Sequence, residues 1–146
     1  MKKIDKDIRW LQRLDNFQKA FLSLKEAMEL SMTRDLSDIE KEGFIQRFEY
    51  NWELSWKTIK EFYKYLGDSS IQGSRDAFLM AYKNGLIKSE EHGQYFMNSI
   101  KSRNDTVHGY NKETANEIFC AIRDKYYKAF EELLKSLLRE KKSRNL

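Results

Sequence analysis

The chain of 146 residues contains no proline, only six glycines and a single cysteine. Without proline, nothing in the sequence forces a helix to break, so long uninterrupted helices are expected. The single cysteine, Cys120, excludes a disulfide within the chain. Two histidines and one cysteine are too few for a dedicated zinc or transition-metal site, so we expect neither a metal nor another cofactor.

Long apolar runs are also missing, and none of those present could span a bilayer. The first residues turn acidic at Asp5 and hold no apolar signal core, so we expect a cytoplasmic protein with no membrane segment. Hydrophobic residues make up 40% of the chain, enough for the core of one domain over residues 1–146. The net charge of +4 is compatible with nucleic acid without demanding it. The basic tail, residues 139–146, is expected to fray.

Apolar residues recur at steps of three and four over most of the chain, the spacing of one face of an α-helix. Helices are expected over about 5–32, 38–66, 75–83, a segment that follows Ser89 and a last segment that begins at Asn111 or Thr114. Their expected core positions are Trp10, Leu14, Phe17, Phe21, Leu24, Met28, Phe44, Ile45, Phe48, Trp52, Trp56, Ile59, Tyr63, Leu66, Ala115, Ile118, Ile122, Tyr126, Ala129, Leu133 and Leu137. No window alternates apolar and polar residues as a strand would. The sequence therefore predicts an all-α fold, an up-and-down four-helix bundle with an additional short helix.

Local signals mark where these helices begin and end. Ser37 and Glu40 are three residues apart and predict a capping box, and Gly67 fits the left-handed position after the second helix. Ser74 and Ser89 are the expected N-caps of the third and fourth helices.

One stretch, residues 103–110, concentrates side chains that can do chemistry, and its sequence is RNDTVHGY. Arg103 and His108 are five residues apart, a rotation of about 140° on a helix, so they do not share one helical face. Asn104 and His108, four apart, do share one. Arg103 and His108 can reach one phosphate if the helix loosens before Gly109, or if two copies of the chain face each other across a twofold axis.

Together these side chains can cleave RNA without a metal. The His108 imidazole can take the proton of a 2′-hydroxyl near neutral pH, and the Arg103 guanidinium can hold the phosphate and stabilise its growing charge. Asn104 can orient either group, and Tyr110 places an exposed hydroxyl at the mouth of the site. A purely structural reading stays open: a helix cap, an ion pair between Arg103 and Asp105, or a surface histidine.

A polar ridge runs beside the apolar face of the second helix. Glu49, Glu53 and Lys57 follow one another at steps of four residues and so lie on one side of that helix. The ridge is either a solvated face with an ion pair between neighbours, or an acidic strip that supports the site or faces a partner.

Four stretches carry a family resemblance. The pattern of Arg103-Asn104-x-x-x-His108-x-Tyr110 resembles the signature of HEPN domains, the higher-eukaryote and prokaryote nucleotide-binding superfamily. Residues 48–57, FEYNWELSWK, resemble the second helix of one branch, the nucleotidyltransferase substrate-binding family. Ser74-Arg75-x-Ala77 with Gly85-Leu86-Ile87, and Glu113-Thr114-Ala115, also resemble that branch, so the similarity covers nearly the whole chain.

The resemblance implies a helical bundle that forms a homodimer through the motif face, together with a minimal nucleotidyltransferase as partner. In such pairs the HEPN protein is a toxin-like ribonuclease, with the matches of Arg103 and His108 as catalytic residues. From the side-chain chemistry above, we expect Asn104 to act with them. Asp105, Glu49 and Glu53 would support them. The transferase acts as antitoxin by transferring AMP to the tyrosine that matches Tyr110. The alternative that the resemblance implies is a non-catalytic subunit that binds substrate or nucleotide for the transferase.

Overall fold

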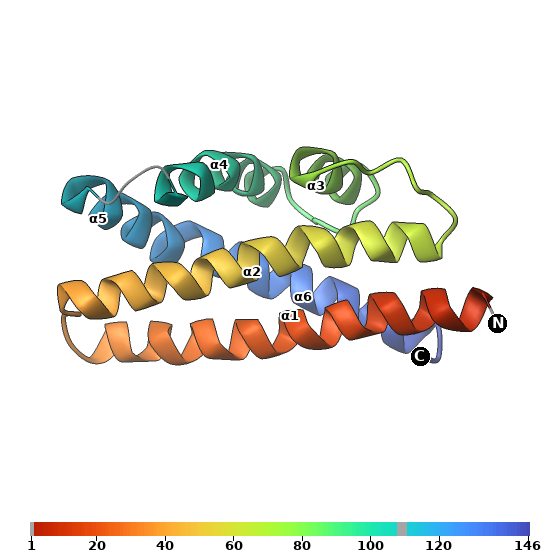
Figure 1. Ribbon diagram of the computed structural model, residues 1–146, viewed down its shortest axis with the longest axis horizontal. Helices are drawn as coiled ribbons and strands as arrows, with labels where there is room; N and C mark the ends of the chain where they lie inside the picture. The colour runs from red at the N-terminus through yellow and green to blue at the C-terminus, as the bar shows by residue number, and fades with distance from the viewer. Residues whose placement is uncertain (1, 108–110) are drawn as a thin grey trace.

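The computed structural model describes the backbone of residues 2–107 and 111–146, and within these ranges all regular structure is helical (Figure 1). In chain order the elements are α1 (Lys2–Thr33), α2 (Asp38–Tyr65), α3 (Ser74–Lys83), α4 (Glu90–Val107), α5 (Lys112–Ala121), the π-helical turn η1 (Ile122–Tyr126) and α6 (Tyr127–Ser143). The predicted all-α class is therefore confirmed. None of the described helices is both long enough and apolar enough to cross a membrane.

Four long rods make up the bundle, and the short α3 packs against α2 and α4 (Figure 1). The first two rods, α1 and α2, run antiparallel along each other and form the most extensive helix pair. The third rod is α4, and the fourth is the continuous run of α5, η1 and α6, which crosses behind α2 in Figure 1. The bundle with one additional short helix matches the predicted architecture.

The predicted helix ends are mostly confirmed. The Ser37 hydroxyl accepts a hydrogen bond from the Glu40 amide (3.2 Å), and the Glu40 carboxylate accepts one from the Ser37 amide (2.9 Å). The Arg34 guanidinium donates two hydrogen bonds to the same carboxylate, at 2.8 and 2.6 Å. These bonds, together with the one from the Ser37 amide, lower the pKa of Glu40 to about 2. Gly67 takes a left-handed φ of +100°, as the end of α2 requires. The Ser89 hydroxyl caps α4 by accepting from the His92 amide at 3.1 Å.

The predicted N-cap of the third helix is wrong. Ser74 is the first residue of α3, and Gly73 occupies the cap without any side-chain hydrogen bond. The stabilising contact comes from within the helix instead, because the Asp76 carboxylate accepts from the Gln72 amide at 3.0 Å. For the last helix, of the two candidates, Asn111 is the cap, and its side-chain oxygen accepts from the Glu113 amide at 2.9 Å.

Two further predictions, one about the end of α2 and one about the C-terminal tail, also fail. Leu66 was expected in the core but is 44% exposed, because α2 ends at Tyr65 and the chain turns away from the bundle there. The basic tail does not fray at residue 139, since α6 continues to Ser143. Just beyond, the Arg144 guanidinium lies 5.6 Å from the centre of the Phe62 ring and 5.9 Å from that of Tyr65. Packing on these aromatic rings holds the tail in place.

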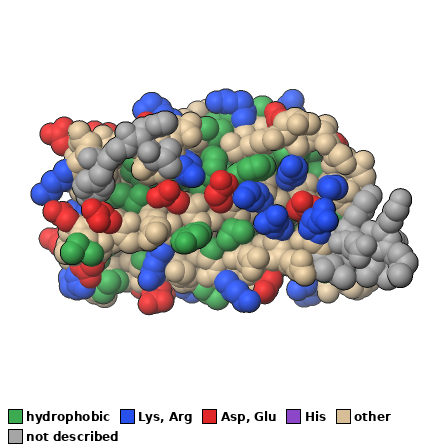
Figure 2. All heavy atoms as spheres, in the orientation of Figure 1, with side chains coloured by type: hydrophobic (Ala, Val, Ile, Leu, Met, Phe, Trp, Pro, Cys, Tyr) green, Lys and Arg blue, Asp and Glu red, His purple; other side chains and the backbone are tan. Residues whose placement is uncertain are grey.

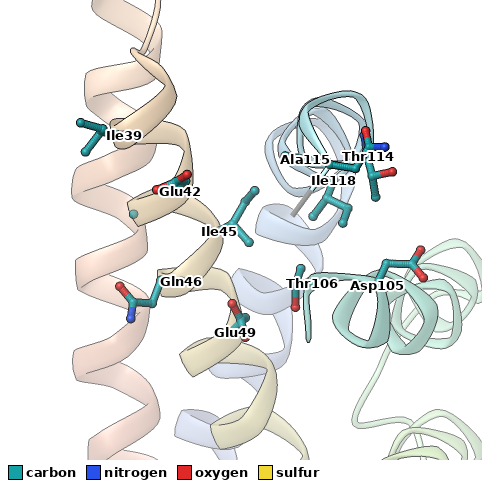
Figure 3. A pocket seen from close by; sticks show the side chains of 12 residues that line it. Ile39, Glu42, Ile45, Gln46, Glu49, Asp105, Thr106, Thr114, Ala115 and Ile118 are labelled. Atoms are coloured by element: carbon teal, nitrogen blue, oxygen red, sulfur yellow. The ribbon is translucent and has the colours of Figure 1, made fainter. Parts of the chain in front are cut away.

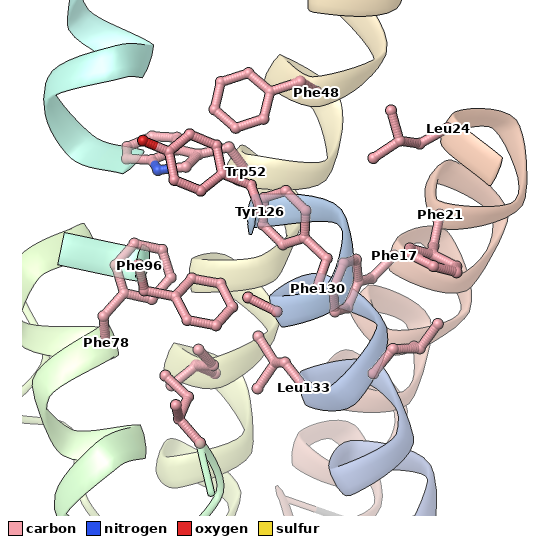
Figure 4. Close-up of a cluster of buried hydrophobic side chains, with 14 of the residues drawn as sticks. Phe17, Phe21, Leu24, Phe48, Trp52, Phe78, Phe96, Tyr126, Phe130 and Leu133 are labelled. Atoms are coloured by element: carbon pink, nitrogen blue, oxygen red, sulfur yellow. The ribbon is translucent and has the colours of Figure 1, made fainter. Parts of the chain in front are cut away.

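The predicted core is otherwise confirmed, apart from Met28 and Trp56, which are half-buried. Its centre is Phe130 on α6, which is fully buried (Figure 4). The Phe130 ring centre lies 6.4 Å from that of Phe17 on α1, 6.0 Å from Phe48 on α2 and 5.6 Å from Phe96 on α4. A single side chain thus joins all four rods.

A buried amide that the sequence pattern did not reveal links α1 to α2. Asn51 is fully buried, and its side-chain nitrogen donates to the carbonyls of Ala20 on α1 and Arg47 on α2, both at 2.9 Å. Because a buried polar group is costly without partners, this contact favours one register of α1 against α2.

Phe130→Ala should destabilise the protein by about 3 to 5 kcal/mol, because it removes the ring shared by all four rods and leaves a cavity. Urea unfolding followed by circular dichroism measures this loss. Tyr50→Ala, at a ring that is 61% exposed, is the matched control and should stay within about 0.5 kcal/mol of the parent chain. Equal losses for the two variants would contradict the central place of Phe130.

Candidate functional site

The motif residues predicted to carry function fall, in chain order, in the C-terminal turn of α4 and just after it, whereas the supporting Glu49 and Glu53 belong to α2. Arg103, Asn104 and Asp105 belong to the last described turn of α4, which ends at Val107. His108 and Tyr110 fall outside the described residues, so the pairing of His108 with Arg103 or Asn104 stays a prediction.

Arg103 lies against an aromatic face. The carbon at the centre of its guanidinium is 5.6 Å from the centre of the Trp52 ring on α2, within the range of a cation–π contact. The side chain is half-buried, and its Nε is a buried donor with no hydrogen-bond partner among the described residues. The cation is therefore held in place by an aromatic ring instead of a carboxylate.

Trp52 is itself fixed by a hydrogen bond in the core. Its indole nitrogen donates to the Ser99 hydroxyl on α4 at 3.0 Å, and that hydroxyl donates to the Phe96 carbonyl at 2.5 Å. The indole and the ring of Phe78 on α3 meet edge to face, with the two centres 6.2 Å apart. These contacts come from two neighbouring helices and leave Trp52 little freedom to turn.

A second hydrogen bond secures the same stretch of α4. The hydroxyls of Ser102 and Tyr126 are 2.8 Å apart, and Tyr126 belongs to the π-helical turn η1. Burial raises the pKa of Tyr126 and outweighs the opposite effect of Ser102, so the phenol remains protonated and able to bond near neutral pH. The Tyr126 ring also stacks on Phe48, with centres 5.6 Å apart.

Asp105 takes no part in holding Arg103. It forms an ion pair with Lys101, one turn earlier on α4, at 3.1 Å. On a helix, Asp105 and Arg103 are about 200° apart and face nearly opposite directions. The predicted alternative of an ion pair between Arg103 and Asp105 is therefore wrong, because Asp105 pairs with Lys101. Asn104 lies exposed on the surface.

A groove of about 510 Å³ opens beside this turn, between α2, the end of α4 and the start of α5 (Figure 3). Its walls combine carboxylates with apolar side chains. The residues that line it are Ile39, Glu42, Gly43, Ile45, Gln46, Glu49, Asp105, Thr106, Asn111, Thr114, Ala115 and Ile118. Among them are three carboxylates and no lysine or arginine, so the described lining of the groove is acidic.

The two glutamates of the polar ridge take different positions. Glu49 is half-buried and lines the groove. Glu53 instead accepts a hydrogen bond from the indole nitrogen of Trp56 at 2.9 Å, and it does not line the groove. Over the described ranges, no ion pair joins Glu53 to Lys57, so the ion-paired interpretation of the ridge does not hold.

The groove and Arg103 meet in the same helical turn. Thr106 lines the groove, and its hydroxyl donates to the backbone carbonyl of Arg103 at 2.7 Å. The turn thus presents a carboxylate-lined groove on one side and a guanidinium on an aromatic ring on another.

Sequence patterns placed the motif but missed the residues that orient it. Trp52 was predicted only as a core residue, and Ser99 and Tyr126 were given no role in the site. One available signal was Ser99 itself, which lies three residues after Phe96 on the apolar side of α4, where a buried hydroxyl needs a partner.

The helices, with the groove and Arg103 at the end of α4, define an all-α bundle protein. Residues 12–139 match the family model described as nucleotidyltransferase substrate binding protein like, and the chain belongs to that family. The family resemblance found in the sequence is thereby confirmed.

One solved relative supports the fold with a related sequence. The chain is similar to the crystal structure of a protein from Thermus thermophilus, with 29% identity and a TM-score of 0.73. The similarity covers 83% of this chain and 98% of that one. No curated protein matches the sequence significantly.

Proposed function

We propose that this chain is the substrate-binding subunit of a two-component nucleotidyltransferase, and that it contacts the transferase through the groove beside the α4–α5 turn. Family membership over residues 12–139 supports the first part. The observation that carries the second part is the acidic lining of the groove, supplied by Glu42, Glu49 and Asp105.

The charge of the groove favours a protein over a nucleic acid as its occupant. Its three carboxylates repel a phosphate backbone, whereas lysine or arginine side chains of a protein would be attracted. The apolar walls add surface that a protein side chain can bury, including Ile39, which is 81% exposed. A basic, partly apolar segment of the transferase fits both features.

The neighbouring cation completes the proposal. A transferase docked in the groove would bring its nucleotide close to the turn that carries Arg103, and a guanidinium is suited to hold a phosphate through two hydrogen bonds. Tyr110, in the same motif, is then the proposed acceptor of the transferred AMP. Phosphate added beside Arg103 would occupy the guanidinium.

Reversal of charge in the groove should weaken the complex with a minimal nucleotidyltransferase, the partner encoded beside this chain that the resemblance implies. Glu42→Lys and Glu49→Lys should each weaken binding at least about tenfold at low salt, because each places a cation against the basic segment expected there. Isothermal titration calorimetry at two salt concentrations measures the effect. Glu61→Lys, further along α2 and outside the groove, is the control with the same charge change. Affinities as high as that of the control would remove the groove as the docking surface.

A second function is favoured by the state of Arg103. In the part of the chain that the structure describes, its guanidinium lies over the Trp52 ring and pairs with no carboxylate, so its charge remains available to a phosphate. We propose that two copies of the chain face each other and form a metal-independent endoribonuclease. His108 takes the proton of the ribose 2′-hydroxyl, the 2′-oxygen attacks phosphorus, and the 5′-oxygen leaves with a proton from water. Arg103 stabilises the phosphate charge, and Asn104 orients the phosphate.

The ribonuclease proposal predicts cleavage of single-stranded RNA by the purified chain in EDTA. His108→Ala should abolish cleavage because it removes the proposed base, and a melting temperature close to that of the parent shows that the variant is folded. Lys101→Ala, at an exposed residue of the same helix, is the control and should cleave as before. Intact RNA after long incubation with the well-folded parent dimer would leave the chain with its binding role alone.

Intact mass spectrometry tests the proposed AMP acceptor. Co-expression with an active transferase should add one or more adenylyl units to the chain, and Tyr110→Phe should remove them because the accepting hydroxyl is gone. Tyr50→Phe, at an exposed tyrosine on α2, is the control and should keep them. An unchanged mass of the parent chain beside an active transferase would refute modification at this hydroxyl.

A further inference from the structure

The orientation of Arg103 depends on a residue that belongs to no part of the motif. Its guanidinium lies over Trp52, which is on α2 and far away in the sequence, with 5.6 Å between the guanidinium carbon and the ring centre. Trp52 is 6% exposed, so almost all of its surface packs within the protein.

An aromatic face holds a guanidinium in a way that a carboxylate cannot. All five N–H donors of arginine point outward from the guanidinium, and a cation–π contact with a ring draws on its positive charge and not on an acceptor for these donors. A carboxylate would take up those donors and neutralise the charge. Over the Trp52 ring, Arg103 keeps its charge, and no carboxylate among the described residues takes up its donors.

The inner edge of Arg103 is already removed from water. Its Nε is buried and makes no hydrogen bond to any residue that the structure describes. An unpartnered donor on a cation is costly to bury, so the Trp52 contact helps to hold the guanidinium in this position. The same loss of water strengthens the attraction between the guanidinium and an oxyanion.

Ser99 fixes the platform on which the guanidinium rests. It is 1% exposed, accepts from the Trp52 indole at 3.0 Å and donates to the Phe96 carbonyl. The hydroxyl therefore sets the angle of the indole relative to α4, the helix that also carries Arg103. Because Ser99 and Arg103 both belong to α4, the Trp52–Ser99 hydrogen bond attaches the indole to the same helix that carries the guanidinium.

We propose that Trp52, locked by Ser99, is a positioning residue that holds the Arg103 guanidinium charged and oriented for a phosphoryl oxyanion. The proposal rests on the phosphate-binding role given to Arg103 above. The oxyanion belongs either to a free nucleotide or to an RNA phosphodiester, and the two sources share this chemistry.

Binding of two probes, AMP and a short single-stranded RNA, tests the proposal with the full chain. Trp52→Leu should weaken the probe that binds by about tenfold, because the platform is lost. Trp52→Phe keeps an aromatic face and should recover much of that loss, which a purely structural defect would not explain. Ser99→Ala should give an intermediate loss. Trp56→Leu removes an indole that bonds to Glu53 and makes no cation–π contact with Arg103 in the described structure. It is the matched control and should bind as the parent does.

Arg103→Ala separates this inference from the proposed function. If Arg103→Ala abolishes binding but Trp52→Leu and Ser99→Ala bind like the parent, Arg103 holds phosphate and the positioning role is overturned. If Arg103→Ala also binds like the parent, or if neither probe binds the parent, the phosphate site itself is overturned. Weakening of AMP identifies the nucleotide as the source, and weakening of RNA alone identifies the phosphodiester.

Fluorescence keeps the test decisive if Trp52→Leu fails to fold. In a chain with Trp10→Phe and Trp56→Phe, Trp52 is the remaining indole, so its emission reports on Arg103 directly. Addition of the bound probe should change that emission, and Arg103→Ala in the same background should remove the change. If Trp52 emission does not change on addition of a probe known to bind, the proposal is overturned.

Discussion

The packing of the Phe130 ring is the contact on which the rest of the structure depends. It meets Phe17, Phe48 and Phe96, one ring from each of the other three rods, at the centre of the core (Figure 4). Phe96 lies one turn before Ser99 on α4, so the same packing that joins the rods also sets the position of the functional end of α4. The core therefore sets the geometry of the site, because Ser99, which orients Trp52, bonds to the backbone of the buried Phe96.

Separation of charge within one helical turn is what the core makes possible. Arg103 rests on an aromatic ring, while Asp105 turns the other way toward Lys101 and the groove. Had the two side chains paired, the carboxylate would take up the Arg103 donors and leave them less available to a phosphate. On the face shown in Figure 2, Lys and Arg side chains gather over the second half of α2.

Sequence patterns succeed in this chain where the cause is local and fail where it is not. The Ser37–Glu40 capping box and the left-handed Gly67 depend on neighbours in sequence, and both are confirmed. The tail was wrongly expected to fray because the rings that hold Arg144 come from α2, far away in the chain. The motif was found by its spacing, but its orientation depends on Trp52 and on the π-helical turn η1, whose extra residue per turn has no signature in sequence.

Labelling of carboxyl groups in the chain alone and in complex with the transferase is the most direct test of the central claim. Carbodiimide coupling followed by peptide mass spectrometry reports how accessible each aspartate and glutamate is. The account predicts that Glu42, Glu49 and Asp105 become protected in the complex while Glu61 labels as before. Unchanged labelling of all three groove carboxylates in a complex shown to have formed would contradict it.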